Sequence, residues 1–273
     1  MTDMTMHPFD EAVRLAPLGG DRFNGHISPA YGNMVGPFGG VIAAVMLNAV
    51  LGHPSRQGDP VALTVNFAAP IKDAAFVITA RAVRTNRSNQ HWLLELEQDG
   101  NVAITATALL ATRRETWRST EVLPPQAPAV ASVIPLTGDG LPAWARWVSN
   151  YELRVVRGNM TVDGVEREDS ASTLWVRDAV PRPLDFLSLA ALSDVFFPRV
   201  MVRRQRMIPS GTVSMTVYFH ADAEALSRQG TDALLATARA QRFHDLYFDQ
   251  TAQLWSKDNE LLVVTNQLVY YRE

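Results

Sequence analysis

The sequence predicts an α+β protein made of two copies of one unit, in which a long apolar helix is followed by a run of antiparallel strands. The repeat can be read residue against residue. LTVNFAAP at 63–70 matches MTVYFHAD at 215–222, and ITARAVR at 78–84 matches ATARAQR at 236–242. The offset is 152 positions for the first pair and 158 for the second. A chain of 273 residues, 47% of them hydrophobic, can bury a core in each copy.

The first copy begins with a glycine-rich segment and an apolar helix. Glycines within 32–40 permit a tight backbone, and residues 41–51 are apolar on all sides except at Asn48, which is typical of a buried helix. The strands that follow are predicted at 61–70, 76–88, 91–100 and 102–114. Asp99-Gly100 is a hairpin turn signal between the last two strands.

The second copy repeats this order. Its helix is predicted at 184–197, between Pro183 and Pro198, and Asp258-Asn259 takes the place of the first hairpin turn. The two helices should be the central helices of the fold. We expect one unit at 1–120 and the other at 143–273, joined by a linker rich in Pro and Gly at 121–142.

One carboxylate, Asp194, lies within the apolar run at 184–197. On a helix it would share a face with Leu187, Ala190 and Ala191, where an apolar residue is expected. Removing an ionised carboxylate from water costs several kcal/mol unless polar groups contact it. Asp194 is therefore a candidate functional residue, and the alternative interpretation is a solvent-facing Asp at a helix end.

Polar residues distinguish the second copy from the first. Asp194 is opposite Asn48 in the repeat, and Gln267 is opposite Ala108. In the strand that begins at Thr212, strict alternation would place Thr212 on the polar face with Ser214. The alternative explanation for a Thr at the start of a strand is its ordinary β propensity. The second copy is therefore expected to hold the chemistry.

Three motifs resemble those of the type II acyl-CoA thioesterases: LSDVFFP at 192–198, TVSMTVYFH at 212–220 and VVTNQLVYYR at 263–272. GPFGGVIAAVMLNAV at 36–50 is similar to the N-terminal helix of that family. The resemblance implies a double hotdog fold, with two central helices each wrapped by a curved antiparallel β-sheet. It also implies that Asp194, Thr212 and Gln267 are catalytic.

The chemistry implied is hydrolysis of fatty acyl-CoA by a water molecule. Asp194 would act as general base, and Thr212 and Gln267 would hold the water. Backbone N–H groups of Gly39 and Gly40 could bind the substrate carbonyl oxygen, although glycines before a buried helix also serve close packing. The alternative function is a catalytically silent hotdog protein that binds acyl-CoA or a protein partner.

Composition limits the other functions. A net charge of −3 and the short cluster Arg203, Arg204 and Arg206 do not predict nucleic-acid binding, and these arginines either contact coenzyme A phosphates or lie in solvent. The chain has no cysteine, its six histidines show no metal-ligand spacing, and no nucleotide-binding motif occurs, so no metal or cofactor is expected. It has no membrane-length apolar run, and the first ten residues lack an apolar signal core. We expect a cytoplasmic protein that forms a homodimer or higher homo-oligomer.

Overall fold

The structure, a computed structural model, describes residues 6–137 and 141–273. Its α-helices are α1 (Pro8–Ala12), α2 (Gly39–Leu51), α3 (Phe186–Leu192), α4 (Arg199–Arg204) and α5 (Ala223–Gln229). The strands of the first half are β1 (Ala16–Gly19), β2 (Arg22–His26), β3 (Gly32–Asn33), β4 (Gly36–Pro37), β5 (Asp59–Phe67), β6 (Ala75–Thr85), β7 (Asn89–Gln98) and β8 (Asn101–Ala111). The strands of the second half are β9 (Tyr151–Arg157), β10 (Ser172–Asp178), β11 (Ser210–Phe219), β12 (Leu234–Arg239), β13 (Phe243–His244), β14 (Tyr247–Trp255) and β15 (Leu261–Tyr271).

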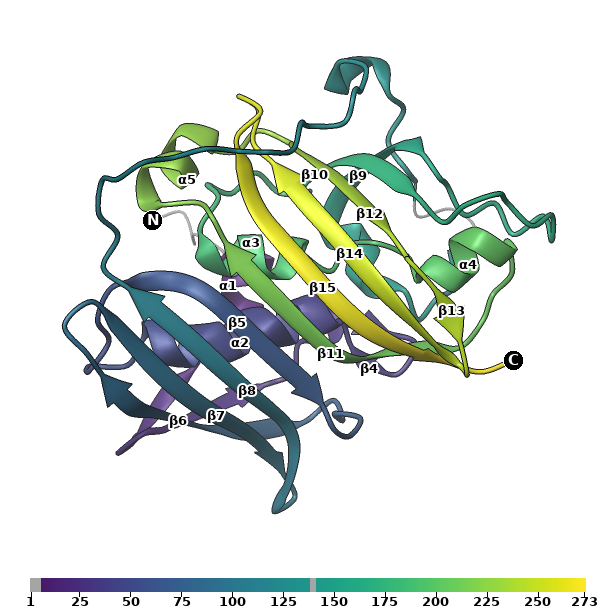
Figure 1. Ribbon diagram of the computed structural model, residues 1–273. Helices are drawn as coiled ribbons and strands as arrows, with labels where there is room; N and C mark the ends of the chain where they lie inside the picture. The colour runs from purple at the N-terminus through teal and green to yellow at the C-terminus, as the bar shows by residue number, and fades with distance from the viewer. Residues whose placement is uncertain (1–5, 138–140) are drawn as a thin grey trace, which may run out of the picture.

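In the described part of the chain, one antiparallel sheet contains all of these strands except β3 and β4, which pair with each other. From the centre outward the first half has the order β5-β8-β7-β6-β2-β1, and the second half has the order β11-β15-β14-β12-β10-β9. The halves meet edge to edge where β5 pairs with β11 (Figure 1). This pairing leaves neither inner edge open, and it confirms the predicted double hotdog architecture.

An approximate two-fold axis passes between Thr64 and Thr216. The two residues are opposite each other in the β5–β11 pair, and their hydroxyl oxygens are 2.9 Å apart. They are also the residues that the repeat offset of 152 makes equivalent. The repeat in the sequence is therefore a symmetry of the sheet.

The two central helices pack against each other on the concave side of the sheet (Figure 1). α2 is buried on nearly all sides, in agreement with its uniformly apolar sequence. α3 begins at the N-cap Asp185, whose carboxylate accepts a 2.8 Å hydrogen bond from the Ser188 N–H.

The second helix is shorter than the predicted range of 184–197. It ends at Leu192, and the N–H groups of Asp194 and Val195 then bond to the carbonyls of Ala191 and Leu192, three residues back. Such bonds tighten the last turn, and the chain leaves the helix direction. The prediction that Asp194 lies on a helix face is therefore wrong, because Asp194 lies just beyond the helix end.

The predicted hairpin between β7 and β8 is confirmed. Asp99 and Gly100 have φ angles of 49° and 74°, which a two-residue turn between antiparallel strands requires. Asn259 in the corresponding turn of the second half also has a positive φ of 63°. The turn signals of both copies thus lie where the strands reverse.

A long connector, residues 112–137, leads from β8 toward the second half without forming a strand. Arg113 fixes its start by donating 2.8 Å hydrogen bonds to the carbonyls of Pro60 and Phe219. The indole N–H of Trp175 fixes a later point through the carbonyl of Pro128, at 3.0 Å. The predicted linker at 121–142 overlaps this connector, except that residues 138–140 lie outside the described residues. The unit boundaries at 120 and 143 remain predictions, and residues 1–5 of the first unit are likewise outside the described residues.

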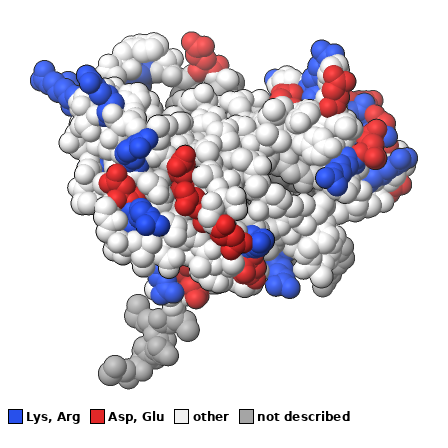
Figure 2. All heavy atoms as spheres, turned by 90° about the horizontal axis from the view of Figure 1, so that it is seen from below, with Lys and Arg blue, Asp and Glu red and all other residues white. Residues whose placement is uncertain are grey.

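The surface carries both charge signs. On the face shown in Figure 2, acidic and basic side chains are interspersed without a continuous basic patch. Within residues 6–137 and 141–273, no helix combines the length and the apolar character needed to cross a membrane.

Candidate active site

The carboxylate of Asp194 lies at the N-terminal end of α2. Its Oδ1 accepts a 2.8 Å hydrogen bond from Nε2 of Gln267, and the backbone N–H of Gly40 also donates to the carboxylate. A Cβ atom on Gly39 would lie 2.7 Å from Oδ2, so only glycine permits this approach. The first N–H groups of a helix have no partner within the helix and carry a partial positive charge, which stabilises a carboxylate.

Burial nevertheless raises the pKa of Asp194 to about 7, and the hydrogen bonds from Gln267 and Gly40 offset only part of this increase. Sequence alone left the direction of the shift open, and in the structure desolvation is the larger effect. A carboxylate with a pKa near neutrality is a more effective general base than an ordinary aspartate.

Thr212 reaches the site because of a β-bulge. In the β11–β15 pair, Thr212 is opposite Val269 but Ser214 is opposite Leu268, so Val213 is an extra residue in β11. The bulge turns Thr212 to the concave side, whereas Ser214 stays on the outer face. The prediction that Thr212 shares a face with Ser214 is therefore wrong, because strict alternation assumes a regular strand.

The three polar side chains form one chain of hydrogen bonds. Oγ1 of Thr212 donates to Oε1 of Gln267 at 3.2 Å, and Nε2 of Gln267 donates to Asp194. The hydroxyl thus orients the amide, and the amide presents its N–H to the carboxylate. Three residues from β11, β15 and the end of α3 therefore meet at one point.

These side chains line a cavity of about 430 Å³ whose other walls are largely apolar. Asp194 is the only Asp, Glu, Lys or Arg among the described lining residues. Phe38 and Trp147 form part of the wall and stack with their ring centroids 4.5 Å apart and an interplanar angle of 7°. The cavity therefore suits an uncharged, mainly apolar group next to a single carboxylate.

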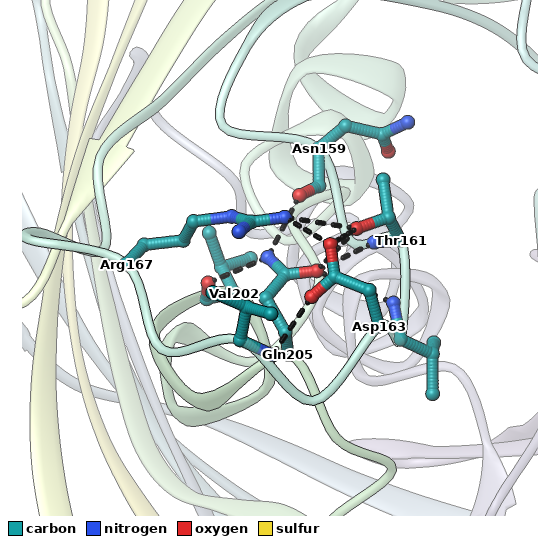
Figure 3. A network of polar contacts seen from close by, with 8 residues as sticks. Asn159, Thr161, Asp163, Arg167, Val202 and Gln205 are labelled. Atoms are coloured by element: carbon teal, nitrogen blue, oxygen red, sulfur yellow. Dashed lines mark hydrogen bonds and ion pairs between the residues drawn. The ribbon is translucent and has the colours of Figure 1, made fainter.

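Gln205 fixes another part of the wall. This fully buried residue at the end of α4 has a φ of 50°, and its side-chain amide holds the irregular segment 158–170 (Figure 3). Oε1 accepts from the Thr161 N–H at 2.7 Å and Nε2 donates to the carbonyl of Asn159 at 3.0 Å. Met160, between these two anchors, lines the cavity together with Met201 of α4.

The remaining predicted residues have different surroundings. Gly39 lines the cavity, and its N–H is at the first position of α2, whereas the Gly40 N–H is already bonded to Asp194. Arg203 pairs with Glu166 at 3.0 Å, and Arg204 pairs with Glu273 at 2.6 Å. None of the three clustered arginines lines the cavity.

Among its described residues, the first half has no matching polar set. Asn48, which the repeat places opposite Asp194, donates a 2.7 Å hydrogen bond to the carbonyl of Val13. Ala108, opposite Gln267, is buried. The fully buried Phe9 and the neighbouring Val13 belong to the core of this half.

Gln250, a buried residue of β14, also lines the cavity, although it is not among the residues predicted from the sequence. A signal was available, because Gln250 alternates with the buried residues Phe248 and Ala252 and so interrupts an apolar strand face. Trp147 and Met160 also line the cavity without having been predicted, because they lie in irregular segments whose position no periodic pattern indicates.

Two family models together match most of the chain. Residues 28–111 match the family model described as acyl-CoA thioesterase N-terminal domain, and residues 124–271 match the model described as acyl-CoA thioesterase C-terminal domain. No curated protein matches the sequence.

Solved structures resemble the chain over nearly its full length. A conserved hot dog fold protein of unknown function from Alicyclobacillus acidocaldarius is 49% identical, with a TM-score of 0.93, and the match covers 98% of this chain and 99% of that one. An acyl-CoA thioesterase II from Mycobacterium marinum is 16% identical, with a TM-score of 0.76 and coverage of 97% and 98%. A tesB protein from Mycobacterium avium subspecies paratuberculosis is 18% identical, with a TM-score of 0.77 and coverage of 98% and 100%. The last two similarities concern the fold alone.

Proposed function

Because the chain belongs to the acyl-CoA thioesterase family, with both its N-terminal and its C-terminal domain, we propose that it hydrolyses fatty acyl-CoA thioesters to the free acid and coenzyme A. The observation that carries this proposal is the carboxylate of Asp194, which has a pKa near 7 and faces an apolar cavity. A base of this kind can take a proton from water at neutral pH.

In the proposed mechanism, ionised Asp194 accepts a proton from a water molecule as the water oxygen attacks the thioester carbonyl carbon. Thr212 and Gln267 orient the carboxylate and the water, which reduces the entropy lost on reaching the transition state. Charge develops on the carbonyl oxygen and requires a hydrogen-bond donor. The N–H of Gly39 is a suitable donor, since the first N–H groups of a helix lack partners within it. The carbon–sulfur bond then breaks, and the thiolate of coenzyme A takes up the proton.

The alternative is a silent protein that binds acyl-CoA without hydrolysing it. An assay of free thiol release from a series of acyl-CoA thioesters of increasing chain length separates the two functions. We expect release that saturates with substrate and depends on chain length, and that falls sharply in Asp194→Asn. Binding of the same thioesters without thiol release would replace the hydrolase by the silent protein.

A further inference from the structure

We propose that the side-chain amide of Gln250 binds the carbonyl oxygen of the thioester. This inference rests on the proposed function, and it begins with an unusual polar group. Gln250 is 3% exposed and lines the cavity, and no hydrogen bond joins its amide to any residue in the described part of the chain. The amide is open to the cavity and is not sealed within the packed core. A polar group placed in a mainly apolar cavity without a protein partner is available to a ligand, and such groups fix the orientation of what binds there.

Gln250 lies next to the reacting groups. In the β14–β15 pair it is directly opposite Gln267, and both side chains face the cavity. Opposite residues in antiparallel strands have Cβ atoms about 4.5–5.5 Å apart, within the reach of two glutamine side chains. The free amide is therefore beside the residue that holds Asp194.

The first half shows what this position contains when no site is present. Trp92 and Ala108 are paired in β7 and β8 as Gln250 and Gln267 are in β14 and β15. Both first-half residues are apolar and buried. The two glutamines thus occur together in one half, and neither occurs at the equivalent position of the other half. The fold itself therefore does not require them.

Three of the other donors near Asp194 already have an acceptor. Gln267 donates to Asp194, Thr212 donates to Gln267, and the Gly40 N–H donates to Asp194. The two N–H groups of Gln250 are not committed within the described residues, so they can bind the oxygen on which charge develops, together with Gly39.

The test compares Gln250→Leu with Gln253→Leu, which changes the same residue type on the outer face of the same strand. We expect Gln250→Leu to lower kcat about 10²-fold with little change in KM, since the interaction strengthens in the transition state. Its Tm should change little, because the amide forms no hydrogen bond with the described residues and leucine is of similar size. Gln253→Leu should leave kcat unchanged.

Binding of two inert analogues gives a readout that does not need turnover. An acyl-CoA ketone keeps the carbonyl and replaces sulfur by CH₂, whereas an alkyl-CoA thioether lacks the carbonyl. Gln250→Leu should weaken binding of the ketone about threefold to tenfold and leave the thioether unchanged. Equal affinities of wild type and Gln250→Leu for the ketone would overturn the proposal. Failure of the wild type to bind or hydrolyse any acyl-CoA would instead overturn the proposed function.

Discussion

Nε2 of Gln267 donates a 2.8 Å hydrogen bond to Oδ1 of Asp194, although 73 positions separate the two residues in the sequence. β15 supplies the amide and the end of α3 supplies the carboxylate, and both groups face the same cavity. The following predictions depend on this pair and on its immediate neighbours.

Replacement of Asp194 by Asn should lower kcat about 10²- to 10⁴-fold, since the base that activates water is lost. Thr212→Ala and Gln267→Ala should each cost less, because they remove an orienting hydrogen bond and leave the base. Steady-state kinetics on one good acyl-CoA substrate measure all three. Near-normal kcat in Asp194→Asn would assign this residue an electrostatic or structural role.

The pH dependence should follow the raised pKa of Asp194. Since the carboxylate form is required, kcat/KM should fall with unit slope as the pH decreases through about 7. The Asn variant should lack this limb. A wild-type profile that is flat from pH 8 to about pH 5 would contradict the assigned base.

Stability should change with pH in the opposite sense. The folded-state pKa of about 7 exceeds the ordinary value of 3.8, so the folded state binds the proton more tightly. The stabilisation from protonated Asp194 is fully present below about pH 4 and is lost as the pH rises through 7. At pH 8, Asp194→Asn should therefore be as stable as the wild type or more stable, by up to a few degrees in Tm. Thermal unfolding at pH 8 and pH 4 measures this, and a marked loss of Tm at pH 8 would indicate that Asp194 serves the fold.

Two adjacent glycines should respond differently to alanine. On Gly39 the new Cβ would press on Oδ2 of Asp194, so Gly39→Ala should lower kcat with a small effect on Tm. On Gly40 it would lie 2.3 Å from the carbonyl oxygen of Ala191 and 2.6 Å from the ring of Phe38, both in the packed core. Gly40→Ala should therefore destabilise the fold by about 1–3 kcal/mol. Urea unfolding and kinetics on the two variants test this contrast, and equal stability losses would refute it.

Gln205→Ala should release the segment that carries Met160. The N–H of Thr161 and the carbonyl of Asn159 would lose their partner, and each lost hydrogen bond costs about 0.5–1.5 kcal/mol. Since Met160 lines the cavity, the preferred acyl chain length should also broaden or shift. Arg167→Ala, which removes an exposed ion pair with Asp163 in the same segment, should cost less than about 1 kcal/mol. An unchanged chain-length profile in Gln205→Ala would show that Met160 keeps its place without the clamp.

The sequence by itself determined the architecture. Two copies of one pattern predicted two helices and two equivalent sheets, because the hydrophobic periods and the turn signals at Asp99-Gly100 are local properties of the chain. Comparison of the copies also identified Asp194 and Gln267 as polar residues that the fold does not require, since the first copy has Asn48 and Ala108 in their places.

Only the tertiary structure decided how these residues meet. Thr212 reaches the concave side through the bulge at Val213, which depends on the register between β11 and β15. Gln250 lies opposite Gln267 because of the register between β14 and β15, which sequence patterns do not predict. The pKa of Asp194 depends on the end of α2, where a helix from the other copy supplies the Gly40 N–H and excludes water. Register and desolvation arise from contacts between distant segments, so no local pattern contains them.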